Sequence, residues 1–249
     1  MAKTLLNITQ EILSEMDSDE VNSISDTVES EQVANIVITS YRDMMSNRNW
    51  PHQRSAAVMT ARGDSNYPTH MILSDDVKEL ISVRYNKATV GETQKRYGDV
   101  SYKSPDNFLA YTNPRNNDNS NVEVVSDDSG IDLLIVNDAH PTYYTSFDDT
   151  NVIFDSYHNG VDSSLQASKV QALGYILSEL TFSDTATPTM PDEALSALIE
   201  ESKSRAQLKL RQFQDVKSEG EASRQQRWLS RKAWKTNGGV EYPNYGKGR

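Results

Sequence analysis

The residues able to perform acid–base or metal chemistry are scattered in this sequence. The four histidines are His52, His70, His140 and His158, and none belongs to a His-Glu-x-x-His motif or to a close pair at ligand spacing. The chain has no cysteine, which excludes a disulfide framework, a thiolate metal site and a cysteine nucleophile. The sequence therefore predicts no metal site and no cofactor.

Adjacent carboxylates are the next candidates, because paired aspartates can bind a hard cation or act as acid and base. The pairs are Asp75-Asp76, Asp127-Asp128 and Asp148-Asp149. None has the spacing of a calcium loop, and all fall in predicted turns, where aspartates commonly bind their own backbone. We interpret them as solvated turns. Phosphate-binding glycine loops and the Gly-x-Ser-x-Gly nucleophile motif are absent from the sequence, so we expect no enzyme.

Charge is distributed unevenly over the 249 residues, whose net charge is −11. Residues 1–202 hold 13 Lys and Arg against 32 Asp and Glu, a net charge of −19, whereas residues 203–249 hold 12 against 4, a net charge of +8. The acidic body should repel nucleic acid, and the basic end should attract polyanions or an acidic protein surface.

The segment from residue 217 onward is basic and unusually aromatic. It holds 8 Lys and Arg against 3 Asp and Glu, together with two of the three tryptophans. Three interpretations remain open: a nucleic-acid-binding tail, a solvated terminus, or an arm that docks on another protein. Candidate contact residues are Arg227, Trp228, Arg231, Lys232, Trp234, Lys235, Tyr242 and Tyr245.

Hydrophobic periodicity places these residues among helices and strands. Apolar residues at helical spacing predict helices over about 4–16 and 26–46, and Trp50-Pro51 ends the second. Leu165, Val170, Leu173 and Leu177 predict a third helix over 163–180, although Gly174 interrupts it. Pro191, Asp192 and Glu193 predict the start of a last helix that reaches about 214 or beyond.

Between the helical regions the sequence favours short strands joined by turns. Strands are predicted at 55–61, 69–73 and 79–86, a short helix at 105–111, and hairpins at 122–125 with 131–136 and 143–147 with 152–157. The fold class is therefore α+β, with helices about 4–46 and 163–216 flanking a β-rich portion about 54–158. We expect a helical bundle formed by the N- and C-terminal helices, with an inserted antiparallel β-rich portion. Residues 1–216 form the body, and 217–249 form an extended C-terminal arm.

No run of about 20 apolar residues is present, and the N-terminal residues lack the apolar stretch of a signal peptide. We therefore expect no membrane partner and assembly in a cytoplasm.

Several stretches together carry a family resemblance that extends from about residue 5 to the C-terminus. They are residues 12–24; Asn47-Arg48-Asn49-Trp50-Pro51-His52 with Pro68-Thr69-His70-Met71; Tyr144-Thr145-Ser146-Phe147-Asp148-Asp149 with Phe154-Asp155-Ser156-Tyr157; and 226–234 with Tyr242-Pro243-Asn244-Tyr245-Gly246. The sequence resembles the head–tail adaptor proteins of tailed bacteriophages, in particular the tail tubular protein A and tail-completion group of short-tailed phages.

The resemblance implies a structural virion protein. Such adaptors form a ring, usually of twelve copies, beneath the portal at the capsid vertex, and nozzle or other tail components attach below. DNA passes through the ring during ejection without tight binding. In the family the C-terminal arm commonly docks on the portal, which assigns portal binding to the eight residues named above. The alternative function is a nucleic-acid-binding protein that acts through the basic aromatic tail.

Overall fold

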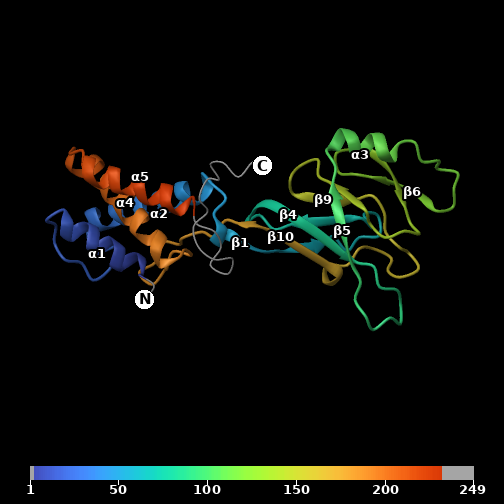
Figure 1. The fold of residues 1–249 in the computed structure, drawn as a ribbon, viewed down its shortest axis with the longest axis horizontal. Coiled ribbons are helices and arrows are strands. Elements are labelled where there is room, and N and C mark those ends of the chain that lie inside the picture. Colours follow the sequence, from blue (N-terminus) through green and yellow to red (C-terminus); the bar gives the residue numbers. More distant parts are fainter. Residues whose placement is uncertain (1–2, 232–249) are drawn as a thin grey trace, which may run out of the picture. The chain divides into compact units, whose positions relative to one another are not determined.

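The computed structural model describes residues 3–231 and divides the chain into two compact units. The helical unit contains residues 3–53 and 177–231 of the described chain, and the sheet unit contains residues 54–176. The mixed α+β class expected from the sequence is confirmed. Figure 1 shows the elements of each unit.

The first two helices begin at side-chain caps. Helix α1 (Leu5–Glu15) follows Thr4, whose hydroxyl accepts a hydrogen bond from the Asn7 amide. Helix α2 (Val28–Ser46) follows Thr27, which forms a reciprocal capping box with Ser30. Capping satisfies amides that have no partner within the first helical turn. The helices predicted over about 4–16 and 26–46 are therefore confirmed.

The C-terminal part of the helical unit contains two helices where a continuous one was expected. Helix α4 (Asp192–Arg211) starts after Pro191, with Asp192 and Glu193 in its first turn. It stops where Gln212 adopts a left-handed conformation (φ 54°). Helix α5 (Val216–Leu229) then begins at Asp215. The expected continuation to residue 214 or beyond is wrong, because the backbone reverses at Gln212.

Helices from both ends of the chain share one core. Helix α4 contacts α1, α2 and α5, and α1 also contacts α2. The largest fully buried side chains of this core include Leu5, Ile8, Ile12, Tyr41 and Met45. Burial of such apolar side chains contributes about 1.5–3 kcal/mol each. No helix in the described part of the chain combines the length and apolar character needed to span a bilayer.

The sheet unit is built on a large, nearly closed sheet with the strand order β1-β10-β4-β5-β8-β9-β3-β2. The two edge strands are consecutive in the chain, separated only by Val58. One extended segment therefore pairs with β10 through its first half and with β3 through its second half. The strands are β1 (Arg54–Ala57), β2 (Met59–Ala61), β3 (His70–Leu73), β4 (Val77–Asn86), β5 (Tyr97–Tyr102), β8 (Tyr143–Thr145), β9 (Asn151–Phe154) and β10 (Val170–Ile176).

Most of the local predictions for this unit are confirmed. The single strand predicted at 55–61 is divided at Val58 into β1 and β2, and only β2 pairs with β3. Strand β8 pairs with β9 as the expected hairpin. Strands β6 (Val122–Ser126) and β7 (Asp132–Val136) form the other expected hairpin, as a separate two-stranded sheet. Helix α3 (Pro105–Thr112) matches the short helix expected at 105–111. Strand β5 was not predicted, and it lies between β4 and β8. It runs parallel to β8, so the expectation of an antiparallel β-rich portion is wrong for this pair of strands.

The helix predicted over 163–180 is wrong. Residues Ala167–Lys169 form one 3-10 turn, and β10 follows as an inner strand between β1 and β4. A Cβ placed on Gly174 would lie 2.7 Å from the carbonyl oxygen of Glu79 and 3.4 Å from Cβ of Ala57. Glycine in this strand therefore marks a close backbone approach rather than a weak point in a helix.

Candidate docking site at the C-terminal helix

Helix α5 positions the part of the basic aromatic segment that the structure describes. The Asp215 carboxylate accepts hydrogen bonds from the amides of Lys217 and Ser218, both at 3.1 Å, and from the Ser218 hydroxyl at 2.7 Å. The Ser218 contacts lower the pKa of Asp215. Ala222 and Leu229 are buried, so this helix packs on the body of the helical unit.

A polar groove of about 430 Å³ lies among residues of α2, α4, α5 and the segment after α2. Its lining residues include Asp43, Arg48, Trp50, Arg205, Gln226 and Arg227. Arg205 spans the groove, donating to Asp43 at 2.6 Å and to Glu201 at 2.9 Å. Burial opposes the charge of Arg205, but these two carboxylates outweigh it and raise the pKa of the guanidinium.

Trp50 is a buried residue of the groove lining. Its indole Nε1 donates to the carbonyl of Met44 at 2.7 Å, and the side chain is 5% exposed. The Arg48 guanidinium lies 5.8 Å from the centre of the Trp50 ring, within cation–π range. Arg48, Trp50 and Arg205 were not predicted as site residues, because they come to line one groove with Arg227 only through the tertiary packing of the helices.

The structure describes three of the eight predicted contact residues. Arg227 is exposed and lines the groove, Trp228 is 41% exposed, and Arg231 is exposed just after the end of α5. Lys232, Trp234, Lys235, Tyr242 and Tyr245 lie outside the described residues. The end of α5 and the residues just after it therefore present two arginines and a partly exposed tryptophan, which are residue types enriched among interface anchors.

A second cluster, in the sheet unit, corrects the interpretation of one acidic pair. Asp127 is buried, and its Oδ1 lies 3.0 Å from Nε2 of the buried His70. Burial opposes ionisation of Asp127, but the Ser129 hydroxyl and amide and His70 outweigh it and lower the pKa of this carboxyl. Burial lowers the pKa of His70 despite the contact with Asp127. Asp127 thus holds the β6–β7 turn against β3 and is not a solvated turn residue.

The remaining aspartates of these pairs stay near the surface. Asp128 forms a two-bond ion pair with Arg62, at 2.6 and 3.0 Å, and Asp148 accepts from the amides of Thr150 and Asn151 within its own turn. Asp75, Asp76 and Asp149 are exposed. The turn interpretation therefore holds for Asp148, whose hydrogen bonds are local.

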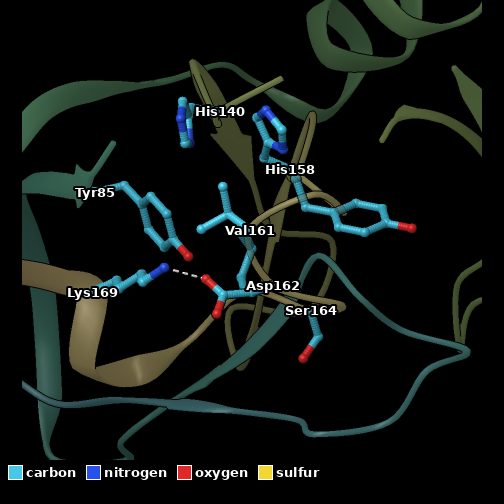
Figure 2. Close-up of a pocket in the computed structure, with 9 residues that line it drawn as sticks. Tyr85, His140, His158, Val161, Asp162, Ser164 and Lys169 are labelled. Carbon is cyan, nitrogen blue, oxygen red and sulfur yellow. Dashed lines mark hydrogen bonds and ion pairs between the residues drawn. The ribbon is translucent and has the colours of Figure 1, made fainter. Parts of the chain in front are cut away.

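The structure also brings together two histidines that the sequence analysis treated as separate. The rings of His140 and His158 are centred 5.2 Å apart beside a small pocket that Tyr85, Asp162 and Lys169 also line (Figure 2). Burial lowers the pKa of His140, and the neighbouring His158 lowers it further. Within residues 3–231 no three His, Asp or Glu side chains are grouped so that they could hold a metal ion.

No protein-family model matches the chain, and no curated protein matches its sequence.

Proposed function

We propose that this protein is a non-enzymatic structural part of a virion: a head–tail adaptor that forms a ring beneath the portal and joins the capsid to the tail. The observation that carries the proposal is the exposure of Arg227, Trp228 and Arg231 at the end of α5, directly before the rest of the basic aromatic segment. An exposed tryptophan between arginines suits a protein partner, because such residues dominate binding energy at interfaces.

The proposed architecture extends the observed α+β class. The helices from the two ends of the chain form a bundle that carries the inserted β-rich portion. Residues 217–249 form the arm whose end reaches the portal. Since α5 buries Ala222 and Leu229, the first part of this arm belongs to the body of the helical unit.

Charge supports a conduit role for the ring. Residues 1–202 carry a net charge of −19, and a DNA channel must not hold its cargo. Repulsion between acidic walls and the phosphate backbone lowers friction over about one Debye length, roughly 8–10 Å. Partners in this proposal are further copies of the chain, usually twelve, the portal, a nozzle or other tail protein, and DNA in transit. The protein resides in the host cytoplasm during assembly and in the virion afterwards.

The test is assembly on the cognate portal ring, followed by measurement of the mass of the complex. Twelve copies of 28.0 kDa would add about 336 kDa. A chain that ends after Arg231 is the sharper variant, because it keeps α5 and its buried contacts. Loss of the mass gain in that variant, with unchanged thermal stability, identifies the following residues as the docking element.

The nucleic-acid alternative predicts a different result. A tail that binds nucleic acid gives micromolar or tighter affinity for DNA, and this affinity falls steeply as salt increases. If the portal adds no mass while duplex or single-stranded DNA binds in this salt-dependent way, the adaptor proposal is overturned.

A further inference from the structure

The turn after β9 contains an Asn-Gly pair in an exposed position. Asn159 and Gly160 are both exposed. The Asn159 amide donates to the carbonyl of Asn137 at 2.8 Å, and the amides of Val161 and Asp162 donate to the carbonyl of His158 at 2.9 and 3.0 Å. Within residues 3–231 no hydrogen bond is found for the amide between them, that of Gly160.

The His158 imidazole folds over this glycine. A Cβ placed on Gly160 would lie 3.0 Å from Cε1 and 3.3 Å from Nδ1 of His158. Nδ1 is buried and has no hydrogen-bond partner in the described part of the chain. In Figure 2 His158 and His140 lie on one side of Val161, and Asp162 and Lys169 lie on the other. A buried ring nitrogen without a hydrogen-bond partner therefore lies beside a glycine whose N–H has no hydrogen bond in the described part of the chain.

We propose that Asn159-Gly160 is a site of self-catalysed deamidation, with His158 as its internal base. Glycine at the second position leaves the attack unhindered, since it carries no Cβ and restricts the backbone least. Histidine is the side chain that most often serves as a general base in proteins.

The reaction needs only water as co-reactant. Nδ1 of His158 takes the proton of the Gly160 amide, and the amide nitrogen attacks the side-chain carbonyl carbon of Asn159. A nitrogen–carbon bond closes a five-membered succinimide, and the bond from that carbon to the side-chain nitrogen breaks. The imidazolium returns its proton to the departing nitrogen, which leaves as ammonia. Water then opens the ring at either carbonyl and gives aspartate or isoaspartate.

The product changes the charge beside the histidine pair. A carboxylate at position 159 adjoins His158, and the isoaspartate form also lengthens the backbone by one carbon within the turn that holds Val161 and Asp162. Both changes act on the pocket of Figure 2, where Lys169 pairs with Asp162. Deamidation is therefore a time-dependent modification of the sheet unit, and it does not depend on the proposed docking role of the C-terminal segment.

The same chain supplies an internal comparison. A second Asn-Gly pair, Asn237-Gly238, is preceded by Thr236 instead of a histidine. Full-length protein is incubated at neutral pH and physiological temperature, and peptide mapping follows the one-dalton mass gain and the ammonia released at each asparagine. The matched variant is His158→Gln, which keeps a polar side chain but removes the base, and Asn159→Gln verifies the assignment of the modified peptide.

We expect His158→Gln to slow deamidation at Asn159 on the order of tenfold, below the hundredfold or more of optimised acid–base sites. The rate at Asn237 should not change. Equal rates at Asn159 in both proteins, or an unmodified Asn159 while Asn237 reacts, would each overturn the proposal. If His158→Gln folds poorly, His158→Phe, which keeps a planar ring but has no base, repeats the comparison.

Discussion

Nε2 of His70 lies 3.0 Å from Oδ1 of Asp127, and neither side chain is more than 8% exposed. The two residues are 57 positions apart and come from β3 and from the turn between β6 and β7. Tyr67 packs edge-on against the His70 ring with centroids 5.1 Å apart, and the Arg62 guanidinium lies 3.7 Å from the centre of the Tyr67 ring. Arg62 also pairs with Asp128, so these contacts fix the β6–β7 hairpin to β3 and to the segment that follows β2.

Removal of the buried carboxylate should destabilise the sheet unit. Asp127→Ala leaves Nε2 of His70 and the Ser129 amide without their acceptor, and an unsatisfied buried polar group costs about 1–3 kcal/mol. Urea unfolding monitored by circular dichroism measures this loss. Asp128→Ala is the matched control, because its ion pair with Arg62 is at the surface and such pairs contribute at most about 1 kcal/mol. Equal losses in the two variants would contradict a special role for Asp127.

Local sequence signals were sufficient for much of the secondary structure. Thr4 and Pro105 mark helix starts, and turn residues mark the two hairpins, because each signal acts within a few residues. Strand β10 had no such signal. Its residues pair with Arg54–Ala57 and with β4, between about 80 and 120 positions away, and Leu165, Val170 and Leu173 happen to follow helical spacing.

In the candidate sites, too, the features with a local sequence signal were predicted and those that depend on long-range packing were not. The basic aromatic composition of the C-terminal segment was sufficient to select Arg227, Trp228 and Arg231, which are exposed. Composition did not indicate that Arg205 would bridge Asp43 and Glu201 beside Arg227, since that requires the packing of three helices. The position of Asp127 in a turn also did not indicate that this residue would be buried in contact with His70, which is distant in the sequence.

Two glycines should respond in opposite directions to the same substitution. Gly174→Ala places a methyl group 2.7 Å from the carbonyl oxygen of Glu79 and 3.3 Å from Val77, and overpacking of this kind costs about 1–3 kcal/mol. Gly220→Ala lies inside α5 with nothing within 4 Å of the new methyl group, and should stabilise the helix by about 0.5–1 kcal/mol. Thermal unfolding of both variants tests this. A neutral Gly174→Ala would contradict the observed approach of β10 to β4.

Acid should weaken the sheet unit before its carboxylates titrate. Folding lowers the pKa of His140 by burial and by the nearby His158, and burial lowers the pKa of His70. The unfolded chain keeps an ordinary imidazole pKa of about 6.5, so it binds protons first as the pH falls below that value. The stability that the neutral imidazoles contribute is therefore complete above about pH 6.5 and is lost on acidification towards their lower folded pKa values.

The melting temperature measured across this pH range provides the test. It should fall between about pH 7 and pH 5 in the unaltered protein, and less steeply in His140→Gln, which has no imidazole to protonate at that position. An identical slope in the variant would show that His140 does not contribute to the pH dependence.

Trp228→Ala should weaken portal attachment more than Lys247→Ala. A tryptophan that becomes buried in an interface contributes about 2 kcal/mol or more, which corresponds to roughly a 30-fold loss of affinity, whereas a charge at the rim contributes little. Trp228 is 41% exposed in the chain alone, which leaves aromatic surface for a partner. Pull-down with the portal ring, together with the melting temperature of each variant, separates docking from packing. If Trp228→Ala lowers the melting temperature as well as portal attachment, the indole of Trp228 packs on the protein's own body. If both variants lose attachment equally, the tryptophan is not an anchor.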